Sequence, residues 1–118
     1  MTNIPDPLHD RLRLGIRLFN ERQFFACHEV LEDEWRPEIG HRRNFLQALI
    51  HIAVAFVHMQ RGNPVGAGGQ LRKGLLKLDK YLPIYEGIDT ARLQSDALTA
   101  LVRIEAGAQS IEYPRITP

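Results

Sequence analysis

The sequence predicts an all-α, single-domain bundle of about five helices with an apolar central third helix. Apolar residues recur at helical spacing in five segments, and short stretches rich in proline and glycine separate these segments. No segment alternates apolar and polar residues as a strand would. A chain of 118 residues is long enough for one core but too short to divide in two, so we expect one domain over residues 1–118.

The first two helices follow from periodicity and from turn residues. Residues 8–22 carry apolar side chains on one face and arginines on the other, which is typical of an amphipathic helix. Asp6 can cap this helix, with Pro7 at its first position. A second helix takes in residues 24–35, FFACHEVLEDEW, and should end near Arg36, because the proline that follows disfavours a helical conformation there.

The third helix, about residues 42–61, is apolar on nearly every side. A helix without a solvent face is expected to be central, with the other helices packed around it. Its one polar stripe consists of Gln47, His51 and His58, which lie within about 40° of each other around the helix axis. These three side chains therefore need hydrogen-bond partners.

The stretch RGNPVGA predicts a sharp turn into a fourth helix. Gly62 can adopt the left-handed conformation that ends a helix, and Asn63 can cap the next one. We expect this fourth helix over about residues 64–82 and a fifth over about residues 90–106. Residues 108–118 are expected to form an irregular C-terminal tail on the surface.

Composition restricts the class of protein. The formal net charge is +1 and the basic residues are scattered, which argues against a nucleic-acid surface. The single cysteine, Cys27, excludes an intrachain disulfide framework and suits a reducing compartment. The chain starts with no basic segment followed by an apolar run, and its longest apolar stretch, residues 48–57, is too short to span a bilayer. We therefore expect a cytoplasmic protein without membrane partners.

The polar stripe of the third helix predicts polar partners on the second helix. Two consecutive helices joined by a short turn should be antiparallel neighbours, and the second helix offers His28 with Glu32 one turn further on. We therefore expect His28 and Glu32 to meet Gln47, His51 and His58 between the two helices. Such a cluster would be buried and would require paired polar groups.

Three interpretations of this cluster stay open. It could be a closed hydrogen-bond network that binds nothing. It could line a small-molecule pocket, with Glu29 or Glu32 poised by a histidine for proton transfer. It could also bind a divalent metal such as zinc, iron or manganese through His28, Glu32 and His58. The segment HEVLE lacks the second histidine of the zinc-protease motif, so that signature gives the metal interpretation no support.

Two segments, FNERQFFACHEVLEDEWR and FLQALIHIAVAFVHMQRGNPVGA, resemble a small all-helical family, the domain of unknown function numbered three-hundred-and-nine. The resemblance spans Phe19 to Ala67 and implies an all-helical fold without an established activity. Its pattern marks the following residues: Phe25, His28, Glu29, Glu32, Trp35, Gln47, His58, Gly62, Asn63 and Gly66. The chain departs from the pattern with His51 in place of glutamine and Ala48 in place of glycine.

The leading functional prediction is a cytoplasmic protein that binds a small ligand or a partner at the polar cluster. One alternative is a hydrolase-like enzyme, metal-dependent or acid–base, that uses Glu32 with His28 and His58. Another is a homo-oligomeric module in which the fifth helix or the tail faces a second copy and the cluster is purely structural. The candidate pocket residues are His28, Glu29, Glu32, Trp35, Gln47, His51, His58 and Asn63.

Overall fold

The computed structural model describes residues 7–118, with side chains from residue 11 onward. Its elements are α1 (Pro7–Asn20), α2 (Phe24–Trp35), α3 (His41–Gln60), α4 (Pro64–Leu78), the 3-10 helix η1 (Asp79–Tyr81), β1 (Ile84–Tyr85), β2 (Ile88–Asp89) and α5 (Thr90–Glu105). The predicted all-α bundle of five helices is confirmed. The expected cap, Asp6, lies outside the described residues.

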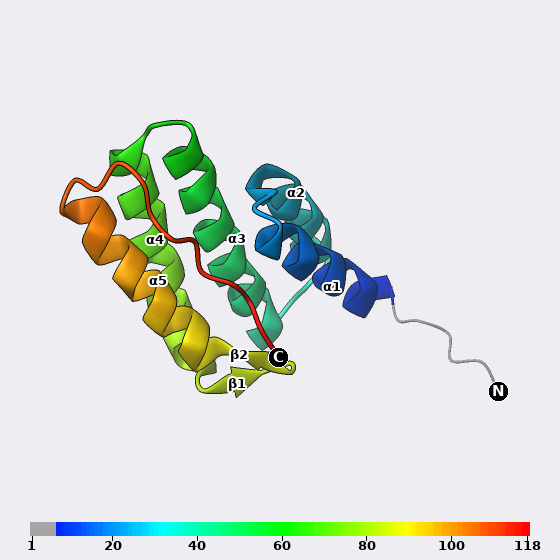
Figure 1. Cartoon of the computed structure of the whole chain (residues 1–118). Coiled ribbons are helices and arrows are strands. Elements are labelled where there is room, and N and C mark those ends of the chain that lie inside the picture. Colours follow the sequence, from blue (N-terminus) through cyan, green and yellow to red (C-terminus); the bar gives the residue numbers. More distant parts are fainter. Residues whose placement is uncertain (1–6) are drawn as a thin grey trace.

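The third helix is the centre of the bundle, as its composition predicts. In Figure 1, α1 and α2 lie on one side of α3, and α4 and α5 lie on the other. Ten of its side chains are buried, among them Phe45, Ile52 and Phe56. The ring of Phe56 packs 5.2 Å from that of Phe24, which in turn lies 5.1 Å from Phe19 in an edge-to-face arrangement. Within residues 7–118, no helix combines the length and the apolar run that a membrane crossing requires.

The approach of α4 to α3 depends on a glycine. A Cβ atom built on Gly74 would lie 2.7 Å from Cγ1 of Ile52 and 3.0 Å from the backbone oxygen of Ala48. No side chain fits at that distance, so Gly74 allows the two helix backbones to pack closely. This contact determines which side of α3 faces α4.

The β-hairpin after α4 differs from the prediction. The expected fourth helix continues to residue 82, but α4 ends at Leu78, and η1 leads into two antiparallel strands that pair Ile84 with Asp89 and Tyr85 with Ile88. Each strand has only two residues, which is too short for an alternating pattern to stand out from the sequence.

The C-terminal tail is irregular, but it is packed into the fold rather than lying only on its surface. Asn20 of α1 holds it, since the side chain donates to the backbone oxygen of Ile116 at 2.8 Å and accepts from its N–H at 2.7 Å. Both Ile116 and Pro114 are buried, and the Tyr113 ring lies 5.1 Å from that of Phe24. The tail crosses the bundle between α1 and α5 (Figure 1), so the end of α1 and the tail are fixed to each other.

We predict opposite effects for two glycine-to-alanine changes in α4. Gly74→Ala should lower the free energy of unfolding by about 1 to 3 kcal/mol, because its Cβ would overlap α3. Gly69→Ala is the matched control, since its Cβ would meet nothing within 4 Å; alanine there should raise the free energy of unfolding by up to about 1 kcal/mol. Urea unfolding of both variants measures the difference, and equal effects would contradict the close approach.

Candidate functional site

The His28–Glu32 pair forms as expected, one helical turn apart on α2. Nε2 of His28 lies 3.1 Å from Oε1 of Glu32, and the other Glu32 oxygen lies 3.5 Å from the Arg36 guanidinium. Nδ1 of His28 is buried and has no hydrogen-bond partner among the described residues. One ring nitrogen is therefore engaged and the other is inaccessible, so His28 has no free nitrogen with which to reach a substrate.

The polar side chains of α3 bond to α4 and to its cap, whereas the sequence predicts partners on α2. His51 Nδ1 lies 2.8 Å from Oε1 of Gln70 in α4, and His58 Nδ1 lies 3.3 Å from the side-chain nitrogen of Asn63. Gln47 makes no hydrogen bond within the described part of the chain. The expected meeting of five polar side chains between α2 and α3 is therefore corrected: α2 contributes only the His28–Glu32 pair, because Gly74 brings α4 against the stripe at His51.

This stripe also borders solvent instead of lying in the core. Gln47, His51, Val54 and His58 are half-buried, whereas ten other side chains of α3 are buried. Half-buried polar groups can be hydrated, so the stripe does not require the closed network that full burial would impose. The polar side chains of α3 therefore mark the strip of this helix that its neighbours leave partly uncovered.

The metal interpretation is not supported by the geometry. Among the described residues, no three side chains of histidine, cysteine, aspartate or glutamate lie close enough to hold a metal ion. The candidate set of His28, Glu32 and His58 does not converge, because His58 is turned to the start of α4. Cys27 offers no nucleophile, because its burial raises the pKa of the thiol to about 12.

The turn between α3 and α4 uses four of the residues that the family pattern marks. Gly62 adopts a φ of +75°, and Asn63 caps α4 by accepting from the backbone N–H of Gly66 at 3.1 Å, as predicted. Because the Asn63 oxygen is used in this way, its amide nitrogen faces His58 and donates to it. A Cβ atom on Gly66 would lie 2.5 Å from that nitrogen. His58, Gly62, Asn63 and Gly66 therefore hold the turn.

Trp35 performs a similar task at the turn between α2 and α3. The Arg43 guanidinium carbon lies 3.9 Å from the centre of the Trp35 ring, and the same guanidinium donates to the backbone oxygens of Trp35 at 3.3 Å and Glu38 at 2.9 Å. The indole N–H is buried without a partner in the described residues. Trp35 therefore fixes this turn and does not present its ring to a ligand.

Two marked residues remain at the surface without such a task. Phe25 is 49% exposed, although it follows the buried Phe24, and Glu29 is exposed one turn further on. The Phe25 ring lies 5.6 Å from that of His28, and the Arg61 guanidinium carbon lies 5.5 Å from its centre. We call Phe25, His28, Glu29 and Arg61 the Phe25 surface. It combines an aromatic ring with both signs of charge at the end of the bundle where α2 begins and α3 ends.

Sequence reasoning missed the most buried acid of the described chain. Glu34 is fully buried, and its carboxylate lies 3.0 Å from Nη1 of Arg42. The same nitrogen lies 3.2 Å from Glu38, and Nε of Arg42 lies 2.6 Å from Glu86 of the hairpin. Burial raises the pKa of the Glu34 carboxyl, against the lowering effect of the hydrogen bond from Arg42. In the run EDEW this acid has no feature that separates it from its solvated neighbours. Its role is structural, since Arg42 joins α2, α3 and the hairpin.

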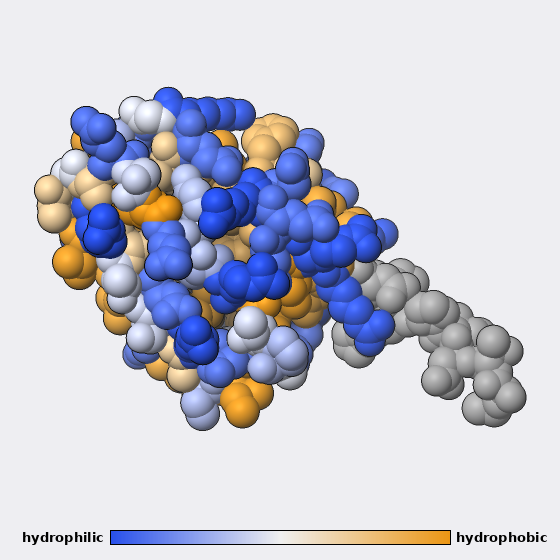
Figure 2. All heavy atoms as spheres, viewed as in Figure 1, coloured by the Kyte–Doolittle hydropathy of each residue, from blue (hydrophilic) through white to orange (hydrophobic). Residues whose placement is uncertain are grey.

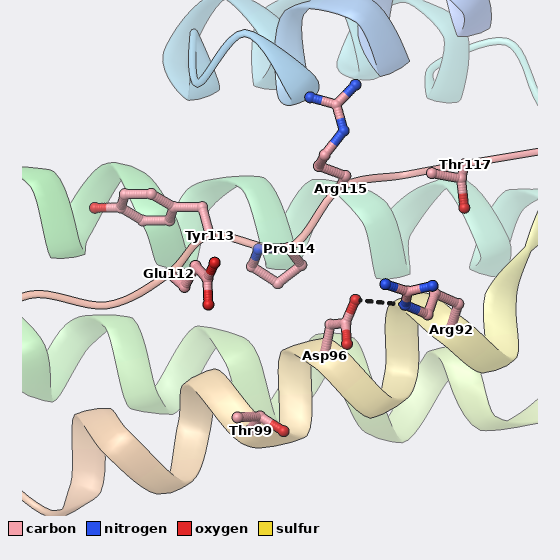
Figure 3. A pocket seen from close by; sticks show the side chains of 8 residues that line it. All are labelled: Arg92, Asp96, Thr99, Glu112, Tyr113, Pro114, Arg115 and Thr117. Atoms are coloured by element: carbon pink, nitrogen blue, oxygen red, sulfur yellow. Dashed lines mark hydrogen bonds and ion pairs between the residues drawn. The ribbon is translucent and has the colours of Figure 1, made fainter.

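Sequence reasoning also missed a cavity of about 300 Å³ between α5 and the tail. Most of its lining residues are polar. They include an Arg92–Asp96 pair 3.0 Å apart on α5, and Glu112 and Tyr113 on the tail (Figure 3). No local pattern predicts it, because it exists only where an irregular segment folds back on a distant helix. The Arg115 side chain leaves the tail toward α1 (Figure 3).

Comparison with known proteins confirms the family resemblance. The model of the family described as "Domain of unknown function (DUF309)" matches residues 12–69, which cover most of α1, all of α2 and α3, and the start of α4. The chain is also 38% identical over 47 residues to the uncharacterized protein YpuF of Bacillus subtilis (strain 168). That match covers 39% of this chain and 27% of the relative, so the chain spans about a quarter of the length of that protein.

We predict that Glu34 makes stability fall as pH rises. Because the pKa of Glu34 is raised on folding above its usual value of 4.5, the folded chain retains a proton that the unfolded chain releases in the pH range just above this value. The free energy of unfolding should therefore decrease through that range in the wild type, relative to Glu34→Gln, which cannot titrate. Urea unfolding between pH 4.5 and 7 measures this difference. Glu29→Gln, at an exposed carboxylate, is the control, and a gap between wild type and Glu34→Gln that does not change with pH would contradict the prediction.

Proposed function

We propose that this protein, which residues 12–69 place in the DUF309 family, is a cytoplasmic binding module that recognises a partner protein through the Phe25 surface. The observation that carries the proposal is the exposure of Phe25, a large apolar ring that is 49% exposed. Five other marked residues hold turns, whereas Phe25 and Glu29 are exposed and hold none.

The chemistry of the Phe25 surface suits a protein partner. Aromatic and arginine side chains contribute much of the binding energy in protein interfaces, and here Arg61 already lies over the Phe25 ring. The side chains of the pair beside it, His28 and Glu32, are 22% and 34% exposed, so a partner could cover them with little rearrangement. The cavities found in the described chain lie elsewhere, along α1, α4 and the tail, which favours a flat contact over an enclosed small ligand.

Charge indicates what the partner should carry. Glu32 and Asp33 are both engaged by Arg36, whereas Glu29 has no ion-pair partner within the described residues. A basic side chain of the partner could pair with Glu29 while an apolar side chain covers Phe25. The proposed partner is therefore a polypeptide segment with an apolar residue next to a basic one.

The acid–base alternative has less support. It needs His28, Glu32 and His58 around one substrate, but His58 is bonded to the cap of α4, and Nδ1 of His28 is buried while Nε2 pairs with Glu32. The single cysteine is a buried thiol of raised pKa, which agrees with a reducing compartment but supplies no nucleophile. A binding role makes no such demand on these side chains.

The proposal predicts that photocrosslinking depends on the position of the photoreactive residue. A photoreactive phenylalanine analogue in place of Phe25 should crosslink in source cells to another protein, whereas the same analogue at Ile39, which is 85% exposed on the α2–α3 turn, should not. With the purified partner, Phe25→Ala should weaken binding about tenfold or more, as loss of a central aromatic anchor does. Ile39→Ala should leave affinity unchanged. A partner that binds Phe25→Ala as tightly as wild type would overturn the proposal.

A second candidate function, self-assembly, is favoured by an apolar face on α4 and α5. Val65, Arg72 and Leu76 fall within about 40° on α4, and Leu98, Val102 and Glu105 fall within about 60° on α5. An ion pair between Arg72 and Glu105 joins the two stripes. The four apolar side chains are 46% to 85% exposed. We call these six residues the α4–α5 face.

The occupant that we propose for the α4–α5 face is a second copy of this chain. A two-fold axis through such a face pairs each stripe with its own counterpart and covers all the apolar side chains at once. The exposed apolar residues would then be buried without the need for a separate partner. The face shares no residue with the Phe25 surface, so self-assembly and partner binding are compatible.

We predict that the protein elutes as a dimer at high concentration and that Val102→Glu shifts it to a monomer. A charged side chain at the centre of an apolar contact would have to be buried unpaired. Light scattering after size exclusion at several concentrations measures the mass, and Ile39→Glu is the control at an exposed apolar residue outside the face. A wild type that stays monomeric at every concentration would contradict self-assembly.

A further inference from the structure

We infer that a hollow between α1 and the C-terminal tail is a binding site for a diphosphate group. The hollow has a volume of about 410 Å³ and is lined by Arg13, Ile16, Arg17, Asn20 and Glu21 of α1 and its C-terminal extension, together with Arg115 of the tail. Three of its six lining residues are arginines, and they come from segments almost a hundred residues apart in the sequence. The site shares no residue with the Phe25 surface or the α4–α5 face.

The position of Arg115 is set by the fold. The next residue, Ile116, is held by two hydrogen bonds to the Asn20 side chain, at 2.7 and 2.8 Å, and its own side chain is buried. Thr117 is held as well, since its backbone oxygen accepts from the N–H of Asp89 at 2.8 Å. Figure 3 shows the Arg115 side chain projecting from this fixed backbone toward α1. A ligand in the hollow would therefore meet an arginine whose backbone is already ordered, which lowers the entropy cost of binding.

The electrostatics of the hollow favour an anion. Arg13 and Arg17 stand one turn apart on the same face of α1, and Arg115 adds a third positive charge, whereas Glu21 is the one acid among the lining residues. Arg17 and Arg115 form no ion pair within the part of the chain that the structure describes. Hydrophilic side chains gather over α1 and the tail in Figure 2. A bound anion would supply the counter-charge that Arg17 and Arg115 lack within the described residues.

The geometry and number of the donors favour phosphate over other anions. A guanidinium presents a planar fork of N–H donors that matches two oxygens of one phosphate. Arg17 and Arg115 supply two such forks that form no ion pair among the described residues, and a diphosphate offers one phosphate group to each of them. The volume is within the range of small-molecule sites. Free pyrophosphate and a nucleoside diphosphate share this chemistry.

Calorimetric titration of the full chain with inorganic pyrophosphate at low salt tests the site. We expect saturable binding at one site per chain, and Arg17→Gln and Arg115→Gln should each weaken it about tenfold, as loss of a charge-assisted contact does. Arg103→Gln is the matched control, because it removes the same charge from an exposed position on α5 outside the hollow, and its affinity should stay within about twofold of wild type. All three side chains are exposed, so the variants should keep the wild-type melting temperature.

A second arm distinguishes the two sources of the diphosphate. Adenosine diphosphate that binds more tightly than pyrophosphate, with the same dependence on Arg17 and Arg115, supports the site and assigns it to a nucleotide. Equal or weaker binding of the nucleotide supports the site and assigns it to the free anion. Absence of pyrophosphate binding at low salt, or an equal loss in Arg103→Gln, overturns the inference. These results do not depend on the Phe25 surface, so they stand apart from the proposed function.

Discussion

The burial of α3 by its neighbours is the constraint on which the rest of the structure depends. Ten of its side chains are removed from water, so the bundle must supply partners or solvent for every polar group that this helix carries. It does so by leaving one strip, at Gln47, His51 and His58, only half covered. Gly74 allows α4 to pack closely beside this strip. The Gln70 side chain of α4 can therefore form a hydrogen bond with His51. The polar stripe is therefore a consequence of close helix packing.

The marked residues of the family pattern include two groups that differ in their contacts. One group closes the turns at the two ends of α3: Trp35 stacks under Arg43 at one end, and Asn63 bonds His58 and caps α4 at the other. Both turns place successive helices side by side, so their residues are needed for the fold itself. The other group, Phe25 and Glu29, faces solvent, and the Phe25 ring lies against the exposed Arg61 and the half-buried His28. A residue that the fold does not require is the better candidate for recognition.

The end of α1 and the C-terminal tail form a second region of close contact. Asn20 and Ile116 exchange two hydrogen bonds, and Tyr113 packs on the aromatic side chains beneath. This contact makes the tail part of the core region and creates hollows on both of its sides, one against α5 and one against α1. An irregular segment is well suited to this role, because it can place charged and apolar residues without the fixed repeat of a helix.

The sequence by itself determined the five helices, the central position of the third, and the cap at Asn63, because helical periodicity and capping depend on residues within a few positions of each other. It also determined the His28–Glu32 pair, which one helical turn brings together. Only the tertiary structure decided that His51 faces Gln70 instead of α2, that Glu34 is buried against Arg42, and that Arg115 stands over α1. Each of these depends on which helices approach and how closely, and such distances follow from packing between segments far apart in the chain.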